Sequence, residues 1–240
     1  MTDEYSESAE FIDLLIAPFW TALRPVLTDV LSSRTAPTAV DLGAGSGHGT
    51  LLLAETLPGA DVVAVEPSAG LRSALLARVH GDERLRRRVT VLPAAFPDVE
   101  LPAGFSVLIA MNVLGHFDEA GRDRLWSLLA GRLDRGGIAI VNLQPPAEPM
   151  PVPESVAATA QVGRLTYEGR AKAEPTGDGT LTWFMTYRTL DGDTAIDERT
   201  VSYAWHLVDE TGLRAEVAAH GLTLTPTGDP QLGVYTITHG

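Results

Sequence analysis

A glycine-rich turn and an acid further along the chain are the residues of this sequence best suited to do chemistry. Residues 39–49 read Ala-Val-Asp-Leu-Gly-Ala-Gly-Ser-Gly-His-Gly. This order predicts a buried strand ending at Leu42, a tight turn at Gly43 and Gly45, and a helix from His48. Backbone N–H groups at such a turn face a ligand with no side chain in the way.

A second apolar strand, over residues 62–66, ends in the acid of this pair. Glu66 follows Gly47 by 19 residues. An acid at that place can accept hydrogen bonds from both hydroxyls of a ribose. The turn and the acid together predict a nucleoside-binding site.

The spacing of the glycines indicates which nucleoside is bound. A dinucleotide-binding turn, G-x-G-x-x-G, would need glycine at the position of His48. The glycines fall instead at positions 43, 45 and 47, with Asp41 two residues before the first. This pattern resembles motif I of the class I S-adenosylmethionine (SAM) dependent methyltransferases. SAM carries an amino acid and a sulfonium instead of a pyrophosphate, so an acid is tolerable beside the turn, and the resemblance implies that Asp41 is one of the cofactor-binding residues.

The resemblance spans residues 40–143 and is expected to extend to 209–240, and it implies roles for individual residues. It implies that Gly43, Ala44 and Gly45 approach the methionine part of SAM and that Glu66 binds the ribose. The other cofactor contacts that it implies are Pro67 and Leu71 on the adenine side, Ala95 and Phe96 at the adenine border, and Met111 and Asn112 near the sulfonium. The family often has an acid where this chain has Ala94-Ala95-Phe96, and that acid is missing here.

A histidine follows the predicted strand over residues 105–111. The segment Asn112-Val113-Leu114-Gly115-His116-Phe117 resembles the family's motif after strand four, which lies beside the methyl group. A hydroxyl acceptor would gain from a general base there, and His116 is the best candidate, whereas an amine acceptor needs none. The alternative is that His116 only packs behind the cofactor.

The remaining core elements alternate between strand and helix. Strands are predicted to end at Leu42 and Glu66 and to span 89–92, 105–111 and 138–143, with helices between them; Gly136-Gly137 is expected to close the helix that starts at Asp118. A last helix over 209–221 precedes a hairpin of strands 222–227 and 232–239. The predicted fold class is α/β, a Rossmann-like doubly wound sheet with an antiparallel terminal hairpin.

An inserted antiparallel meander follows the proline-rich stretch 144–153. Three strands are predicted, over 164–173, 181–190 and 200–208. Trp183 and Trp205 fall on aromatic-rich faces of the last two, and His206 points away from Trp205. The meander could be a cap that supplies substrate contacts, Trp183 and His206 among them. It could equally be a packing surface or the interface of a homodimer.

The N-terminal residues 5–32 are predicted to be helical, with Pro18 and Pro25 kinking or dividing the helix. The segment could be a packed accessory helix or a lid whose substrate contacts are Tyr5, Phe11 and Trp20. The expected organisation is therefore a lid (1–36), a SAM-binding core (37–145 and 209–240) and the inserted sheet (146–208).

Composition limits the classes of partner that this 240-residue chain can be expected to bind. A net charge of −13 argues against nucleic acid, which recruits cationic surfaces. There is no cysteine, and no window approaches about 18 uninterrupted apolar residues, so neither a disulfide nor a membrane span is expected. The acidic N-terminus lacks an apolar signal core, and a cytoplasmic protein is expected. The expected acceptor is a neutral or cationic small molecule, such as a secondary metabolite or amino sugar.

Two other functions stay open. An NAD-dependent oxidoreductase is disfavoured by His48 and Asp41. A SAM-binding protein without methyltransferase activity would keep the glycine turn and Glu66. A hydrolase with a G-x-S-x-G motif and a nucleotide triphosphatase with a G-K-[ST] motif are disfavoured, because neither motif occurs.

Overall fold

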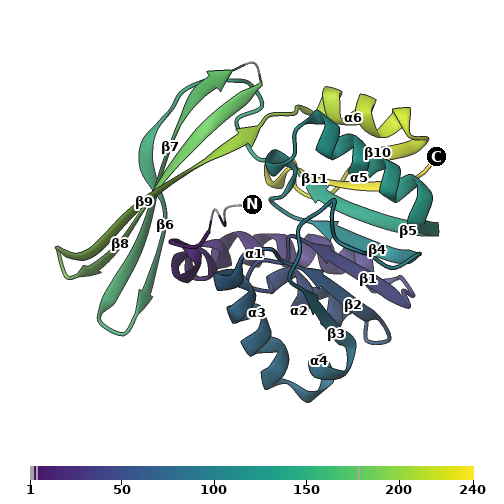
Figure 1. Ribbon diagram of the computed structural model, residues 1–240, viewed down its shortest axis with the longest axis horizontal. Helices are drawn as coiled ribbons and strands as arrows, with labels where there is room; N and C mark the ends of the chain where they lie inside the picture. Colours follow the sequence, from purple (N-terminus) through teal and green to yellow (C-terminus); the bar gives the residue numbers. More distant parts are fainter. Residues whose placement is uncertain (1–2, 4, 178) are drawn as a thin grey trace.

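The computed structural model describes residues 3, 5–177 and 179–240, which build two separate sheets (Figure 1). The larger sheet has the strand order β10-β11-β5-β4-β1-β2-β3. Its strands are β1 (Thr38–Leu42), β2 (Asp61–Val65), β3 (Val89–Leu92), β4 (Phe105–Ala110), β5 (Leu133–Asn142), β10 (Leu222–Pro226) and β11 (Val234–His239). The predicted strands and the terminal hairpin are confirmed.

The order of this sheet decides where a ligand can bind. Strands β1, β2, β3, β4 and β5 are parallel, and β11 pairs antiparallel with both β5 and β10. Because β1 and β4 are neighbours, the order reverses between them, and the segments that follow both strands meet at one edge. This switch point is where doubly wound sheets bind ligands.

Helices cover both faces of the larger sheet, and each face has its own apolar core. One core involves α1 (Ala9–Ser32), α2 (His48–Thr56) and α3 (Ala69–Gly81), and the other involves α5 (Glu119–Arg132) and α6 (Glu210–Ala219) (Figure 1). The short helices are α4 (Glu83–Arg88), η1 (Leu114–His116) and η2 (Pro230–Leu232). Ser68, Asp118 and Asp209 accept backbone N–H groups at the starts of α3, α5 and α6.

Helix α1 is continuous, so the prediction that prolines divide it is wrong. Pro18 and Pro25 are seven residues apart and both exposed, so the carbonyls that they leave unpaired lie on the solvent side. The opposite side buries Phe11, Leu23 and Leu27. By length and mean hydropathy α1 could also cross a membrane, a property that core helices of soluble proteins share.

The predicted helix end at Gly136-Gly137 is also wrong. Helix α5 ends at Arg132, and β5 begins at Leu133 and includes both glycines. Gly136 has a φ of +81°, and a Cβ on Gly137 would lie 2.8 Å from the carbonyl oxygen of Ser106. These glycines therefore serve a turn in the strand and its close approach to β4, and they do not cap the helix.

The smaller sheet contains four strands, one more than predicted. They are β6 (Val152–Val162), β7 (Leu165–Gly177), β8 (Thr180–Asp191) and β9 (Thr194–His206), paired antiparallel in chain order. One face packs on the N-terminal half of α1, where Phe11 stacks on Tyr187. The opposite face carries ion pairs of Arg170 and Arg188 with Glu168.

Candidate functional site

The glycine turn between β1 and α2 forms one side of the site. The N–H groups of Gly43 and Ala44 donate to the carbonyl oxygen of Val65 at 3.0 and 2.9 Å, which holds the turn against the end of β2. Gly43, Gly45 and Gly47 all have positive φ, as the sequence predicts for a tight turn. No atom lies within 4 Å of where a Cβ of Gly45 would stand, so the turn faces open space there.

Glu66 is buried directly beside this turn. Its two carboxylate oxygens accept the N–H groups of Gly45 and Ser68, each at 2.7 Å, and only 4% of the residue is exposed. Burial raises the pKa of Glu66, although these two N–H donors counteract the shift. The carboxylate therefore fixes the turn, and within the part of the chain that the structure describes no further hydrogen-bond donor reaches its remaining lone pairs.

Asp41 lies behind the turn instead of in front of it. Its carboxylate accepts the hydroxyl of Thr50 at 2.6 Å, and the residue is 2% exposed. A Cβ on Gly49 would lie 2.9 Å from the same carboxylate. Burial raises the pKa of Asp41 to about 7. Asp41 therefore connects β1 to the start of α2.

The segment after β4 forms the other side of the site. A Cβ on Gly43 would lie 2.5 Å from Cγ2 of Val113, so the two sides meet in contact, as expected for segments that follow neighbouring strands. Met111 is buried at the end of β4. Asn112 has a φ of +59° and makes two hydrogen bonds with Asn142: its backbone N–H donates to Oδ1 of Asn142, and its own Oδ1 accepts from Nδ2 of Asn142.

His116 ends η1 and contacts the N-terminal segment. Its Nε2 lies 2.9 Å from the hydroxyl oxygen of Tyr5. The rings of Tyr203 and Trp205, from β9, lie 5.9 and 5.0 Å from the imidazole. Three segments distant in sequence, namely the N-terminal segment, η1 and β9, thus bring an imidazole, two phenols and an indole together.

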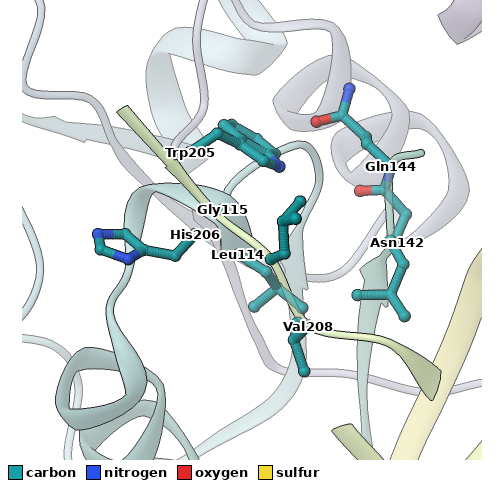
Figure 2. Close-up of a pocket in the computed structure, with 9 residues that line it drawn as sticks. Leu114, Gly115, Asn142, Gln144, Trp205, His206 and Val208 are labelled. Carbon is teal, nitrogen blue, oxygen red and sulfur yellow. The ribbon is translucent and has the colours of Figure 1, made fainter. Parts of the chain in front are cut away.

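A small pocket lies behind this cluster, between η1 and the segment after β9 (Figure 2). Its volume is about 10 Å³, which is room for one water molecule. Figure 2 shows that the Trp205 and His206 side chains leave the strand in different directions, as the alternation predicts. Trp183 shares the inner face of the sheet, opposite Tyr203 in the β8–β9 pair.

Two of the residues predicted to contact substrate pack elsewhere. Phe11 is fully buried between Tyr187 and Tyr167, so it attaches α1 to the smaller sheet and does not reach a ligand. Trp20 stacks on His48 at a centroid distance of 5.8 Å, at the start of α2. Hydrophobic spacing alone could not separate these packing aromatics from Tyr5.

The predicted adenine contacts lie around the end of β3 and the start of α3. Phe96 packs edge-to-face on Phe117 at 5.5 Å, next to η1, and Ala95 beside it is half-buried. Leu71 is buried, whereas Pro67 is exposed. The structure therefore brings Phe96 toward the same segment that carries His116.

Sequence reasoning missed a polar network that joins α1 to the glycine turn. Asp13 accepts hydrogen bonds from Arg78 at 2.7 Å and pairs with His48 at 3.1 Å, and Arg78 also donates to the carbonyl oxygen of Ser46 at 2.6 Å. Burial opposes ionisation of Asp13, but hydrogen bonds from Ser46 and Arg78 hold its pKa below the ordinary value. Burial lowers the pKa of His48. Charged residues on helices gave no sequence signal for this network.

Asp3 is a second contact that sequence reasoning missed. Its carboxylate accepts the hydroxyl of Ser68 at 3.1 Å and the N–H of Ala69 at 3.2 Å, at the start of α3. Tyr5, two residues later, hydrogen-bonds to His116. The N-terminal segment therefore reaches from the end of β2 to the segment after β4, across the switch point of the sheet.

Known proteins that resemble this chain in sequence or structure are methyltransferases, as the geometry of the site suggests. Residues 40–139 match the family model of a methyltransferase domain. A search of curated protein sequences finds no match to the chain. Among solved structures, Streptomyces venezuelae DesVI is similar with a TM-score of 0.77 and 16% identity, covering 98% of this chain and 99% of that one.

Two further structures share the fold over most of their lengths. One is CalS10, a SAM-bound amino pentose methyltransferase from Micromonospora echinaspora (TM-score 0.72, 13% identity, 92% of each chain). The other is the sugar N-methyltransferase KedS8 from Streptoalloteichus sp. (TM-score 0.67, 18% identity, 93% of this chain and 87% of that one). The glycine turn, its acid and the sheet order agree with these findings: residues 40–139 match a methyltransferase domain, and the chain as a whole shares the fold of these solved methyltransferases.

Proposed function

We propose that the protein transfers the methyl group of SAM to the amino nitrogen of a small molecule of the amino-sugar type. The observation that carries this proposal is the Tyr5 hydroxyl beside His116 Nε2, at 2.9 Å, on the segment opposite the glycine turn. Relatives described as an amino pentose methyltransferase and a sugar N-methyltransferase support nitrogen as the acceptor atom. Natural-product biosynthesis is the expected setting.

The residues of the site fit SAM. The open space at Gly45 accommodates a group that lies against the backbone, as a cofactor's amino acid part would. The Glu66 carboxylate keeps lone pairs for ribose hydroxyls beyond its two backbone donors. Leu71, Ala95 and Phe96 would border the adenine, and Met111 and Asn112 the sulfonium. Asp41 would support the turn from behind through Thr50.

The chemistry asks the chain mainly for positioning. When bound, SAM supplies a methyl group already activated on a sulfonium. A neutral amine would use its own lone pair, so the chain would need no base before attack; the carbon–sulfur bond would break, S-adenosylhomocysteine would leave, and the extra proton of the methylated amine would pass to solvent. Tyr5 and His116 would hold the amine by hydrogen bonds and point its lone pair along the line of transfer. Such alignment is worth roughly 7–11 kcal/mol in favourable cases.

The inserted sheet and α1 would complete the acceptor site as a cap and a lid. The aromatic face of the sheet packs on α1 and η1 of the same chain, which supports a cap over an interface for a second copy. Trp183, on this face, remains a candidate substrate contact, and His206 is a weaker one at its edge. A cytoplasmic enzyme without nucleic-acid or membrane partners is consistent with the proposal.

Methylation of a hydroxyl group is the second candidate. It is favoured by the same imidazole, because His116 could serve as the general base that an alcohol needs. The amine is preferred, since it requires only the positioning that Tyr5 and His116 supply together.

The proposal is tested with the whole chain, SAM and a panel of amino sugars, followed by mass spectrometry. A mass gain of one methyl group on nitrogen, and thermal stabilisation by S-adenosylhomocysteine but not by NAD, are expected; ligand at about 100 times its Kd adds about 2.7 kcal/mol. Transfer to alcohols alone would favour the second candidate. Binding of S-adenosylhomocysteine without transfer to any amine or alcohol would indicate a SAM-binding protein without methyltransferase activity.

A further inference from the structure

The indole of Trp205 lies directly on the backbone of Gly115. A Cβ on Gly115 would stand 1.8 Å from Cε2 and 2.2 Å from Cδ2 of this indole, inside its van der Waals surface. Gly115 does not have a positive φ, so its backbone conformation does not require glycine. The requirement is space: any side chain at position 115 would have to displace the ring.

The same indole also touches the residue after Gly115. Its ring centroid is 5.0 Å from that of His116, with the planes at 75°, an edge-to-face contact. Trp205 is itself held firmly, being 8% exposed and paired across β8–β9 with the fully buried Leu181. One side chain of the smaller sheet therefore contacts both the backbone of η1 and the imidazole of His116, which η1 carries.

The smaller sheet also holds the segment that carries Tyr5. Arg199, on β9, donates to the carbonyl oxygen of Glu7 at 3.2 Å and pairs with Glu10 at 2.7 Å. The ring of Tyr203 lies 6.3 Å from that of Tyr5. Both partners of the Tyr5–His116 hydrogen bond are thus placed by β9, although neither belongs to the sheet.

From these contacts we infer that Trp205 is a positioning residue, which holds His116 at the hydroxyl of Tyr5. Gly115 makes this placement possible, because it leaves the space that the indole occupies. The placement follows from the packing alone. Its effect on methyl transfer rests on the proposed function, in which Tyr5 and His116 orient the acceptor. Trp205 need not touch the acceptor for this role.

The test compares Gly115→Ala with a matched control, Gly131→Ala, in the whole chain. Gly131 lies in α5 with no atom within 4 Å of its Cβ position, so the added methyl group displaces nothing there. Gly115→Ala is expected to lower kcat for an amino-sugar acceptor about tenfold, while the Kd for S-adenosylhomocysteine changes less than about twofold. Gly131→Ala should leave both constants unchanged.

Two further variants separate positioning from general disruption. In a His116→Ala background, Gly115→Ala should lower kcat no further, because the residue through which it acts is absent. Trp205→Leu removes the ring without adding bulk and should lower kcat by a similar factor. It also tests the inference should Gly115→Ala fail to fold. A further loss of kcat in the His116→Ala background would overturn the inference.

A readout independent of activity is the proton NMR signal of the His116 imidazole, assigned by its loss in His116→Ala. An indole edge-to-face at 5.0 Å shifts ring protons, so this signal should move in Gly115→Ala and Trp205→Leu and stay in Gly131→Ala. The inference would be overturned if the imidazole signal did not move in Gly115→Ala and Trp205→Leu. It would also be overturned if the wild type methylates and these variants keep its kcat. If the wild type methylates nothing, the proposed function fails, and the NMR comparison still decides the placement.

Discussion

Asn142 holds Asn112 through two hydrogen bonds that use both ends of its side-chain amide. Oδ1 accepts the backbone N–H of Asn112 at 2.7 Å, and Nδ2 donates to Oδ1 of Asn112 at 2.8 Å. Asn142 is 2% exposed at the end of β5, and Asn112 has the left-handed backbone that starts the turn toward His116. The pair therefore fixes the direction in which the chain leaves β4.

Replacing Asn142 by Asp should destabilise the protein. The acceptor for the Asn112 N–H remains, but the donor is lost and two oxygens face each other in a buried place. We expect a loss of about 1–3 kcal/mol in the free energy of unfolding, measured by urea denaturation. Asn112→Asp is the matched control, because its oxygen still accepts from Asn142 Nδ2. Equal losses in the two variants would contradict this account of the pair.

Removing the Glu66 carboxylate should weaken cofactor binding. Glu66→Ala takes away the proposed ribose acceptor and releases the N–H groups of Gly45 and Ser68, so affinity for S-adenosylhomocysteine should fall by about 1.5–3 kcal/mol in calorimetry. Because the carboxylate also fixes the turn, some loss of stability should accompany this change. Glu66→Gln, which keeps one acceptor oxygen, should lose less affinity. An unchanged Kd in Glu66→Ala would exclude a ribose contact.

Asp41 should make stability depend on pH. Burial raises its pKa to about 7 from an ordinary 3.8, so the folded protein holds this proton more tightly than the unfolded chain does. The contribution of the group is therefore most favourable below about pH 4 and declines as the pH rises toward 7, by up to about 4 kcal/mol. Asp41→Asn keeps an acceptor for Thr50 and should remove this decline. Urea denaturation at pH 5 and pH 8 measures it; equal pH slopes in both proteins would refute the assignment.

His116→Ala distinguishes the two acceptor atoms. For an amine, we expect kcat to fall only about tenfold and the rate to follow deprotonation of the amine itself. A base acting on a hydroxyl contributes about 10²–10⁴-fold, so a loss of that size, with disappearance of the pH limb near the usual histidine pKa of about 6.5, would point to oxygen. Binding of S-adenosylhomocysteine should persist in either case. Tyr5→Phe should resemble His116→Ala if the two side chains act as a pair.

Local signals were sufficient to predict the glycine turn and the acid beside it, and insufficient to predict that Tyr5 lies at His116. Gly43, Gly45 and Glu66 could be predicted because a positive φ restricts residue type and because the spacing from turn to acid is set within one strand–helix–strand unit. The contact of Tyr5 with His116 spans 111 positions, and no local pattern encodes it. The same holds for Asp13, whose partners lie on α2 and α3.

The missed strand and the continuous helix have similar explanations. Strand β6 is largely exposed, with little apolar alternation in its sequence, and its pairing with β7 defines it. Helix α1 tolerates Pro18 and Pro25 because its buried residues pack on the core while both prolines face solvent. Tertiary contacts outweighed local propensity in both cases.

Under the proposed function, the contacts of the N-terminal segment should influence how long the cofactor stays bound. Asp3 contacts the start of α3, Tyr5 hydrogen-bonds to His116, and Asp13 pairs with Arg78. These contacts hold the segment across the switch point of the sheet. Under the proposed function, we expect exchange of S-adenosylhomocysteine for SAM to involve breaking these contacts, and such opening steps often limit turnover. Substitutions on the outer surface of this segment could therefore change residence time and product inhibition without altering any group that touches the cofactor.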